Sequence, residues 1–285
     1  MFTILAILSD YLPVVMIHGI NENSTSIEPM AQWIREQLPG VYVLNCDIGY
    51  DKRSSLYMTI EKQVNELAAC INEDPLLADG FVGLGYSQGG YLMRGYLELH
   101  NHVGAPMKRF VSLSAPLGGF FCGKRSTCYK FGKMFTAANF FASRLVYTSF
   151  VQKLVGPSNY WRDPKHLDKY ARKCASLPAL DNARSFSQQK KDNFESVDLI
   201  VLFGSANDGV ISPWQSAWFG VWGADDSYAI DMEGRDEYQR DLFGLKTMNE
   251  NGKIVRIESG LKHREYRTNK EYFVANVVKW LDVKV

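Results

Sequence analysis

Residues 81–89 read Phe-Val-Gly-Leu-Gly-Tyr-Ser-Gln-Gly. The first five are typical of a buried strand, and the segment from Gly89 to Leu99 is typical of a helix. Between the two lies the pattern G-x-S-x-G, in which a serine occupies a sharp, strained turn and exposes its hydroxyl at the end of a sheet. Flanking glycines remove side chains that would clash with the strand and the helix. This context favours Ser87 as a nucleophile over a structural glycine-rich turn.

Strand and helix patterns alternate on both sides of this turn. Continuous apolar runs predict strands, at residues 12–17, 41–45, 81–85, 110–114, 197–203 and 253–257. Apolar residues at helical spacing predict helices, at residues 30–38, 58–72, 89–99 and 271–281. Such alternation implies a mostly parallel central sheet that is flanked by helices on both faces.

The alternation breaks between about residue 117 and about residue 195. This stretch is rich in aromatic residues and shows no convincing strand pattern. We therefore expect a single sheet domain over residues 11–285, with a long insertion at about 117–195. Individually, most of its aromatic side chains are expected to be ordinary core.

A serine nucleophile needs a general base, and the base needs an acid that orients it. After a turn of this kind, the acid and then the histidine follow along the chain. His263 lies in the loop between the last predicted strand and helix, and this position favours it over His166, which lies in the insertion. Asp208 follows the strand at 197–203 and is the predicted acid. The tripeptide Asn-Asp-Gly is also an ordinary turn sequence, so position alone favours this role.

Such a site also requires two backbone N–H groups that stabilise an oxyanion. One is expected from Gln88, which follows the nucleophile, and the other from Ile20, in the loop after the first strand. His18 precedes that loop. We interpret it as a structural histidine rather than a base or a metal ligand, since no partner ligand lies nearby in the sequence. Together these features predict the α/β-hydrolase fold.

Composition and charge exclude several classes of function. The chain has 285 residues, and its 32 Lys and Arg residues almost balance 31 Asp and Glu residues. This balance argues against nucleic acid as a partner, because binding phosphates needs a clustered excess of basic residues. No stretch is long and apolar enough to predict a transmembrane segment. No cysteine and histidine grouping has zinc-site spacing, so no metal or cofactor is expected.

The first ten residues are a candidate short signal segment. Residues 1–8 are a short apolar run without the basic residues that usually begin such signals, and an N-terminal strand or a truncated leader is the alternative. Asn23 begins a glycosylation sequon, which matters only if the protein enters the secretory pathway.

The five cysteines give a second indication of compartment. Cys122 and Cys128 flank a loop-like segment, and a disulfide between them would fit an oxidising compartment. Two free thiols fit the same spacing nearly as well. The remaining three have no neighbouring cysteine in the sequence: Cys46, Cys70 and Cys174.

These features together resemble the palmitoyl-protein thioesterase family over nearly the whole chain after Leu12. The resemblance rests on Val-Met-Ile-His-Gly at the first strand, on Gly-Tyr-Ser-Gln-Gly-Gly at the turn, and on Asn-Tyr-Trp-Arg-Asp-Pro at residues 159–164. A more specific run, Asn-Asp-Gly-Val-Ile-Ser-Pro-Trp-Gln-Ser at residues 207–216, is similar to the type-2 branch of lysosomal thioesterases. Residues 218–220 and 241–247 are similar to the same branch.

The resemblance implies a serine thioesterase that hydrolyses long-chain fatty-acyl thioesters, of coenzyme A or of protein cysteines, without a cofactor or metal. It puts the nucleophile at Ser87, the acid at Asp208, the base at His263 and the oxyanion donors at Ile20 and Gln88. It also implies a lysosomal or secretory-pathway location, and the helical insertion would then bind the lipid chain. The alternatives are an oxyester lipase or carboxylesterase and a non-catalytic lipid-binding relative, the latter disfavoured because the triad is present in the right order.

Overall fold

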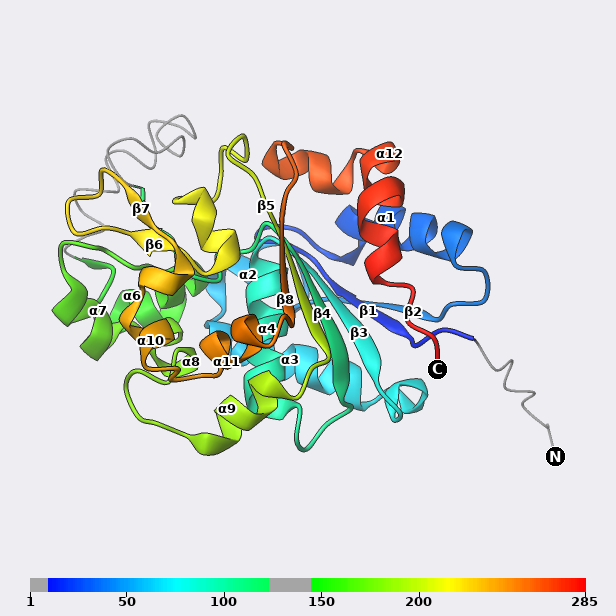
Figure 1. Cartoon of the computed structure of the whole chain (residues 1–285), viewed down its shortest axis with the longest axis horizontal. Helices are drawn as coiled ribbons and strands as arrows, with labels where there is room; N and C mark the ends of the chain where they lie inside the picture. Colours follow the sequence, from blue (N-terminus) through cyan, green and yellow to red (C-terminus); the bar gives the residue numbers. More distant parts are fainter. Residues whose placement is uncertain (1–9, 123–144) are drawn as a thin grey trace.

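The computed structural model describes residues 10–122 and 145–285 (Figure 1). Within these residues, a six-stranded parallel sheet runs in the order β2-β1-β3-β4-β5-β8. Its strands are β1 (Val14–Ile17), β2 (Val43–Cys46), β3 (Phe81–Tyr86), β4 (Met107–Leu113), β5 (Leu199–Gly204) and β8 (Ile254–Glu258). The predicted parallel sheet is confirmed, and each predicted strand overlaps an observed one.

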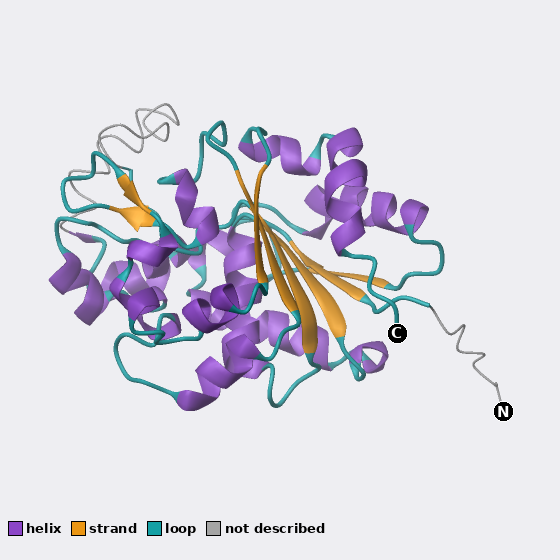
Figure 2. Ribbon diagram, viewed as in Figure 1, coloured by secondary structure: helices purple, strands orange, loops and turns teal. Residues whose placement is uncertain are grey.

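Helices cover both faces of the sheet (Figure 2). One face packs against α3 (Ile60–Asn72) and α4 (Gln88–His100), and the other against α1 (Ser24–Gln37) and the C-terminal segment. Side chains alternate between these two cores, since Val15 faces the first core and Met16 the second. The apolar runs in the sequence reflect this burial on both faces.

Two helices differ from their predicted form. Helix α1 begins at Ser24, earlier than the apolar pattern indicated, because its first residues are polar and Asn23 precedes them as the N-cap. The predicted C-terminal helix is divided into α12 (Lys270–Tyr272), a π turn (Phe273–Val277) and a 3₁₀ turn (Val278–Trp280). These irregular turns still bury Phe273, Val277, Val278 and Leu281 against the sheet.

Two excursions from the sheet lie together on one side of it (Figure 1). In its described residues, the insertion holds short helices, namely α6 (Ser149–Leu154), α7 (Leu167–Lys173), α8 (Leu177–Leu180) and α9 (Gln188–Glu195). A second excursion, which the sequence did not predict, lies between β5 and β8. It holds β6 (Val221–Trp222), β7 (Ala229–Ile230), α10 (Asp236–Gln239) and α11 (Leu245–Glu250).

Cys46 and Cys70 form a disulfide that their sequence spacing did not indicate. Cys46 ends β2 and Cys70 lies in α3, so the fold brings together two cysteines that are 24 residues apart. Cys122 is also disulfide-bonded, and its predicted partner Cys128 lies outside the described residues. Cys174 is free and buried.

A buried ionic cluster joins the two excursions to α4. Arg94 of α4 donates to Glu98 at 2.7 Å and to Asp181 of the insertion at 2.8 Å. Arg235 of the second excursion donates to the other oxygen of Asp181 at 2.5 Å. All four side chains are fully buried, and Glu98 has Arg94 as its partner in the cluster, so the loss of Arg94 would leave the Glu98 charge unpaired.

Glu98 makes the stability of this cluster dependent on pH. Burial raises the pKa of the Glu98 carboxyl to about 7, more than the neighbouring Arg94 guanidinium lowers it. Because the folded protein then binds a proton at Glu98 more tightly than the unfolded chain does, the contribution of Glu98 to the free energy of unfolding should increase as the pH falls from 8 to 5, by on the order of 2 kcal/mol. Glu98→Gln should flatten this dependence, as measured by urea unfolding across the range. Equal pH slopes in the two proteins would contradict the prediction.

Candidate active site

Ser87 occupies the turn between β3 and α4, at the carboxyl end of the sheet. Its φ of 55° and ψ of −128° form a conformation that residues with a side chain rarely adopt. The neighbouring strand supports the turn, since the Ser87 amide donates to the Leu113 carbonyl at 2.8 Å. The side chain is buried but lies at the edge of the sheet where other strands end.

Glycines allow α4 to approach the strands at this turn. A Cβ on Gly85 would lie 2.3 Å from Gly90 Cα, and a Cβ on Gly89 would lie 2.3 Å from the Ile17 carbonyl oxygen. Both contacts are far below van der Waals distance and both involve backbone atoms. The helix therefore reaches its position only because these two residues have no side chain.

The structure brings together the three side chains that the sequence predicted as nucleophile, base and acid. His263 Nε2 lies 2.9 Å from Ser87 Oγ, and His263 Nδ1 lies 2.8 Å from Asp208 Oδ2. The His263 amide also donates to the Asp208 carbonyl at 2.9 Å, which joins the two loops. A carboxylate only accepts hydrogen bonds, so Nδ1 carries the proton and Nε2 is left to accept from the serine hydroxyl. This geometry suits transfer of the serine proton to His263.

Asp208 is held by three further donors. Its Oδ1 accepts from the amides of Val210 at 2.9 Å and Ile211 at 2.7 Å, and its Oδ2 accepts from the Ser114 hydroxyl. Burial alone would raise the pKa of the Asp208 carboxyl, but the His263 charge and hydrogen bonds from His263, Ser114 and Ile211 together lower it below its ordinary value. Asp208 is therefore an ionised acceptor at neutral and mildly acidic pH.

Ser114 was not predicted from the sequence, although it ends the predicted strand at 110–114. Its φ is 51°, and its amide donates to the Phe203 carbonyl at 2.9 Å. As the Ser114 hydroxyl holds the acid Asp208, so the Tyr86 hydroxyl holds the base His263, by donating to its backbone carbonyl at 3.1 Å. Position at the carboxyl end of a strand was the only sequence signal for either residue.

The predicted oxyanion donors lie on two elements that meet at Ser87. The loop after β1 runs against the serine, because a Cβ on Gly19 would lie 3.1 Å from Ser87 Cβ. Ile20 follows in this loop. On the other side of Ser87, Gln88 is the first residue of α4. Its side-chain oxygen, Oε1, accepts a hydrogen bond from the Tyr160 hydroxyl at 2.8 Å. Tyr160 belongs to the insertion, which therefore contacts the candidate site.

The rival base His166 lies elsewhere. Its Nδ1 pairs with Asp163 Oδ2 at 2.8 Å inside the insertion, and its side chain is half-exposed. Among the described residues, no group of three or more His, Cys, Asp and Glu side chains is placed to hold a metal ion. Nor does any helix in residues 10–122 or 145–285 have the length and hydropathy needed to cross a membrane.

A parallel sheet with a serine on a strand-to-helix turn, and with aspartate and histidine on later loops, defines the α/β-hydrolase class. A lipase from Bacillus licheniformis has the same fold, with a TM-score of 0.51 at 14% identity, and the match covers 96% of this chain and 93% of the lipase.

The chain belongs to the palmitoyl protein thioesterase family, whose model matches residues 13–263. It is 30% identical to palmitoyl-protein thioesterase 3 of Dictyostelium discoideum, over 92% of this chain and 88% of that protein. It is 32% identical to lysosomal thioesterase PPT2 of Homo sapiens, over 96% of this chain and 89% of that protein. The predicted resemblance is confirmed, and the chain is an enzyme of a thioester-hydrolysing family.

The close approach of α4 to β1 predicts the effect of one substitution. Gly89→Ala should lower the free energy of unfolding by about 1–3 kcal/mol, although alanine is the better helix former, because its Cβ would collide with a backbone carbonyl. Gly95→Ala on the same helix is the control, since its Cβ would meet a methyl group of Val64, which can shift more easily. Urea unfolding compares the two, and equal losses would contradict this account of the turn.

Proposed function

We propose that this chain is a serine thioesterase that hydrolyses long-chain fatty-acyl thioesters through an acyl-enzyme. The substrate class is palmitoyl-CoA or an S-palmitoylated peptide or protein. One observation carries the proposal, namely the hydrogen-bonded series Ser87–His263–Asp208 at the carboxyl edge of the sheet, in a chain of this family. No cofactor or metal takes part in the reaction as we propose it.

In the first half of the reaction, Ser87 Oγ attacks the thioester carbonyl carbon while His263 Nε2 takes its proton. Asp208 keeps the imidazole in the required tautomer and stabilises the charged ring that forms. The carbonyl oxygen becomes negative and is stabilised by the amides of Ile20 and Gln88. The carbon–sulfur bond then breaks. A thiol has a pKa near 8.5, so its sulfur leaves with modest assistance from the His263 proton.

In the second half, water repeats these steps on the acyl-enzyme. His263 removes a proton from the water as its oxygen attacks the ester carbonyl, and the same two amides stabilise the second oxyanion. Collapse of this intermediate breaks the bond to Ser87 Oγ, which takes the proton back from His263. The fatty acid leaves and the free enzyme is restored.

We propose further that the insertion at 117–195 binds the acyl chain. Support comes from its contact with the site, where Tyr160 bonds to Gln88, and from the aromatic packing of Phe121 on Trp161 at 5.5 Å between ring centroids. These particular rings are buried core, as expected for most of them. Four further phenylalanines of the insertion lie outside the described residues: Phe131, Phe135, Phe140 and Phe141.

A lysosomal or secretory-pathway location is also proposed. Two observations support it: the relatives named lysosomal thioesterase, and the Cys46–Cys70 disulfide, which is of a kind that persists in oxidising compartments. The candidate signal segment falls almost wholly on residues 1–9, which lie outside the described residues.

Substitution of the three central residues tests the reaction. Ser87→Ala and His263→Ala should each lower kcat by about four to six orders of magnitude, because the residues act as a unit. Asp208→Asn should lower kcat by about four orders of magnitude at most, since the serine and histidine remain. His166→Ala should leave kcat close to that of the wild type in the same steady-state assay. A crippling effect of His166→Ala beside a mild effect of His263→Ala would overturn the assignment.

Substrate comparison tests the specificity. Palmitoyl exceeds butyryl by about a dozen methylenes, and each buried methylene is worth about 0.8 kcal/mol, so even partial burial predicts at least ~100-fold higher kcat/KM for palmitoyl-CoA. The measurement is an acyl-CoA series below the micelle concentrations, with a palmitoylated peptide and a matched palmitate oxyester beside it. A flat response to chain length would remove the acyl-binding role of the insertion, and a preference for the oxyester would indicate an esterase.

A further inference from the structure

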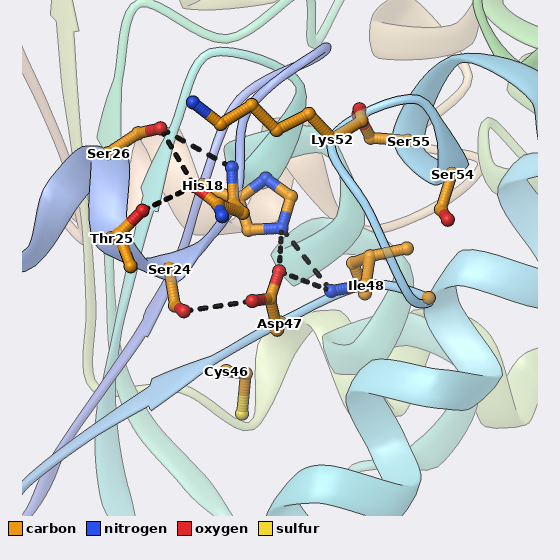
Figure 3. Close-up of polar contacts among 12 residues, drawn as sticks. His18, Ser24, Thr25, Ser26, Cys46, Asp47, Ile48, Lys52, Ser54 and Ser55 are labelled. Carbon is orange, nitrogen blue, oxygen red and sulfur yellow. Dashed lines mark hydrogen bonds and ion pairs between the residues drawn. The ribbon is translucent and has the colours of Figure 1, made fainter.

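His18 is a buried histidine beside the loop whose Ile20 amide we propose as an oxyanion donor. It follows β1 directly, and its Nδ1 lies 2.8 Å from the carbonyl oxygen of Gly19. A carbonyl oxygen accepts hydrogen bonds and never donates them, so Nδ1 carries a proton and donates to Gly19. Figure 3 shows the other edge of the ring facing Asp47 and Ile48, with His18 Nε2 3.0 Å from Asp47 Oδ1. The Ile48 amide donates both to His18 Nε2 at 3.3 Å and to Asp47 Oδ1 at 3.1 Å.

The Gly19 carbonyl and the Ile20 amide belong to one peptide group. Of the described peptide bonds, only Ser212–Pro213 is cis, so the bond from Gly19 to Ile20 is trans. In a planar trans peptide, the C=O and N–H point in opposite directions. A hydrogen bond that holds the Gly19 carbonyl therefore also fixes the direction of the Ile20 N–H. Since Gly19 runs against Ser87, a small rotation of this peptide would turn the donor away from the reacting carbonyl.

Asp47 holds the ring of His18 in place. Strands β1 and β2 are parallel, with Ile17 opposite Cys46, so the next residues of each strand, His18 and Asp47, come side by side. Asp47 Oδ2 accepts from Ser24 Oγ at 2.8 Å, at the start of α1 (Figure 3). The disulfide at Cys46 ties the same strand end to α3. Asp47 is thus anchored on three elements of the fold: β2, α1 and α3.

We propose that His18 is a positioning residue for the oxyanion hole, and that Asp47 orients it. His18 acts on the reaction through the Gly19–Ile20 peptide and does not touch the substrate. The inference rests on the proposed function, because it concerns a donor of that reaction. An oxyanion donor binds the tetrahedral intermediate more strongly than the ground state, so loss of its alignment should lower kcat and leave KM nearly unchanged.

The test compares His18→Leu, which removes the donor at similar volume, with His18→Asn, whose amide can still donate to Gly19. His18→Leu should lower kcat for palmitoyl-CoA about 10–100-fold, less than or equal to the loss of a whole oxyanion donor, with KM within about 3-fold. His18→Asn should stay within about 5-fold of the wild-type kcat.

Inhibitor binding separates this role from a merely structural one. A palmitoyl trifluoromethyl ketone forms a tetrahedral adduct with the serine, whereas S-hexadecyl-coenzyme A, a thioether without a carbonyl, mimics only the bound substrate. His18→Leu should weaken binding of the ketone by about the factor lost in kcat and leave binding of the thioether unchanged. Equal weakening of both inhibitors, or equal behaviour of the leucine and asparagine variants, would overturn the inference.

Asp47 supplies a second pair of variants if His18→Leu does not fold. Its side chain is half-exposed, and Asp47→Ala should lower kcat about 3–10-fold while Asp47→Asn, which keeps an oxygen acceptor, loses less. No difference between wild type and both Asp47 variants would count against the inference. His102→Leu, at a histidine just beyond the end of α4 that lies away from Ser87, is the control and should match the wild type.

Ser87→Ala separates failure of the proposed function from failure of the role of His18. If Ser87→Ala keeps wild-type activity, the proposed function has failed. If Ser87→Ala is inactive while His18→Leu turns over normally and binds the ketone normally, only the role of His18 has failed.

Discussion

Helix α4 begins closer to the strands beneath it than any residue with a side chain would allow. At Gly85 and Gly89, a Cβ would lie 2.3 Å from backbone atoms of α4 and β1. This approach forces the chain to turn within one residue, and that residue, Ser87, has a φ of 55°. The hydroxyl is consequently placed at the end of the sheet, on a rigid element and not on a mobile loop. The rest of the candidate site is arranged around this position.

The parallel sheet explains how the remaining residues reach Ser87. All six strands end at the same edge, and a residue that follows each strand belongs to the candidate site or supports the loop beside it. In sheet order the contributors are Asp47 after β2, His18 after β1, Ser87 after β3, Ser114 after β4, Asp208 after β5 and His263 after β8. The residues span most of the chain, yet each lies within a few positions of a strand end. A change in strand register would therefore disturb the site as a whole.

The sequence predicted the central fold because its strands are buried on both faces and read as continuous apolar runs. It also pointed to Ser87, Asp208 and His263, since a serine motif and a fixed order along the chain limit the choice. Ser114 and Asp47 escaped prediction because their roles depend on a neighbour in the adjacent strand. The pairing of Cys46 with Cys70 escaped prediction because it depends on how α3 packs beside the end of β2. Strands β6 and β7 have two residues each, which is too short for any periodicity to appear.

The proposed mechanism requires that Ser87 carries the acyl group during turnover. Rapid-quench mass spectrometry tests it directly, with wild-type protein mixed with palmitoyl-CoA and stopped within the first turnover. The proposed mechanism predicts one palmitoyl group on the peptide that contains Ser87, formed and lost at rates that match turnover. Palmitoyl found on another residue, such as Cys174, or steady turnover without any acylated peptide would contradict it.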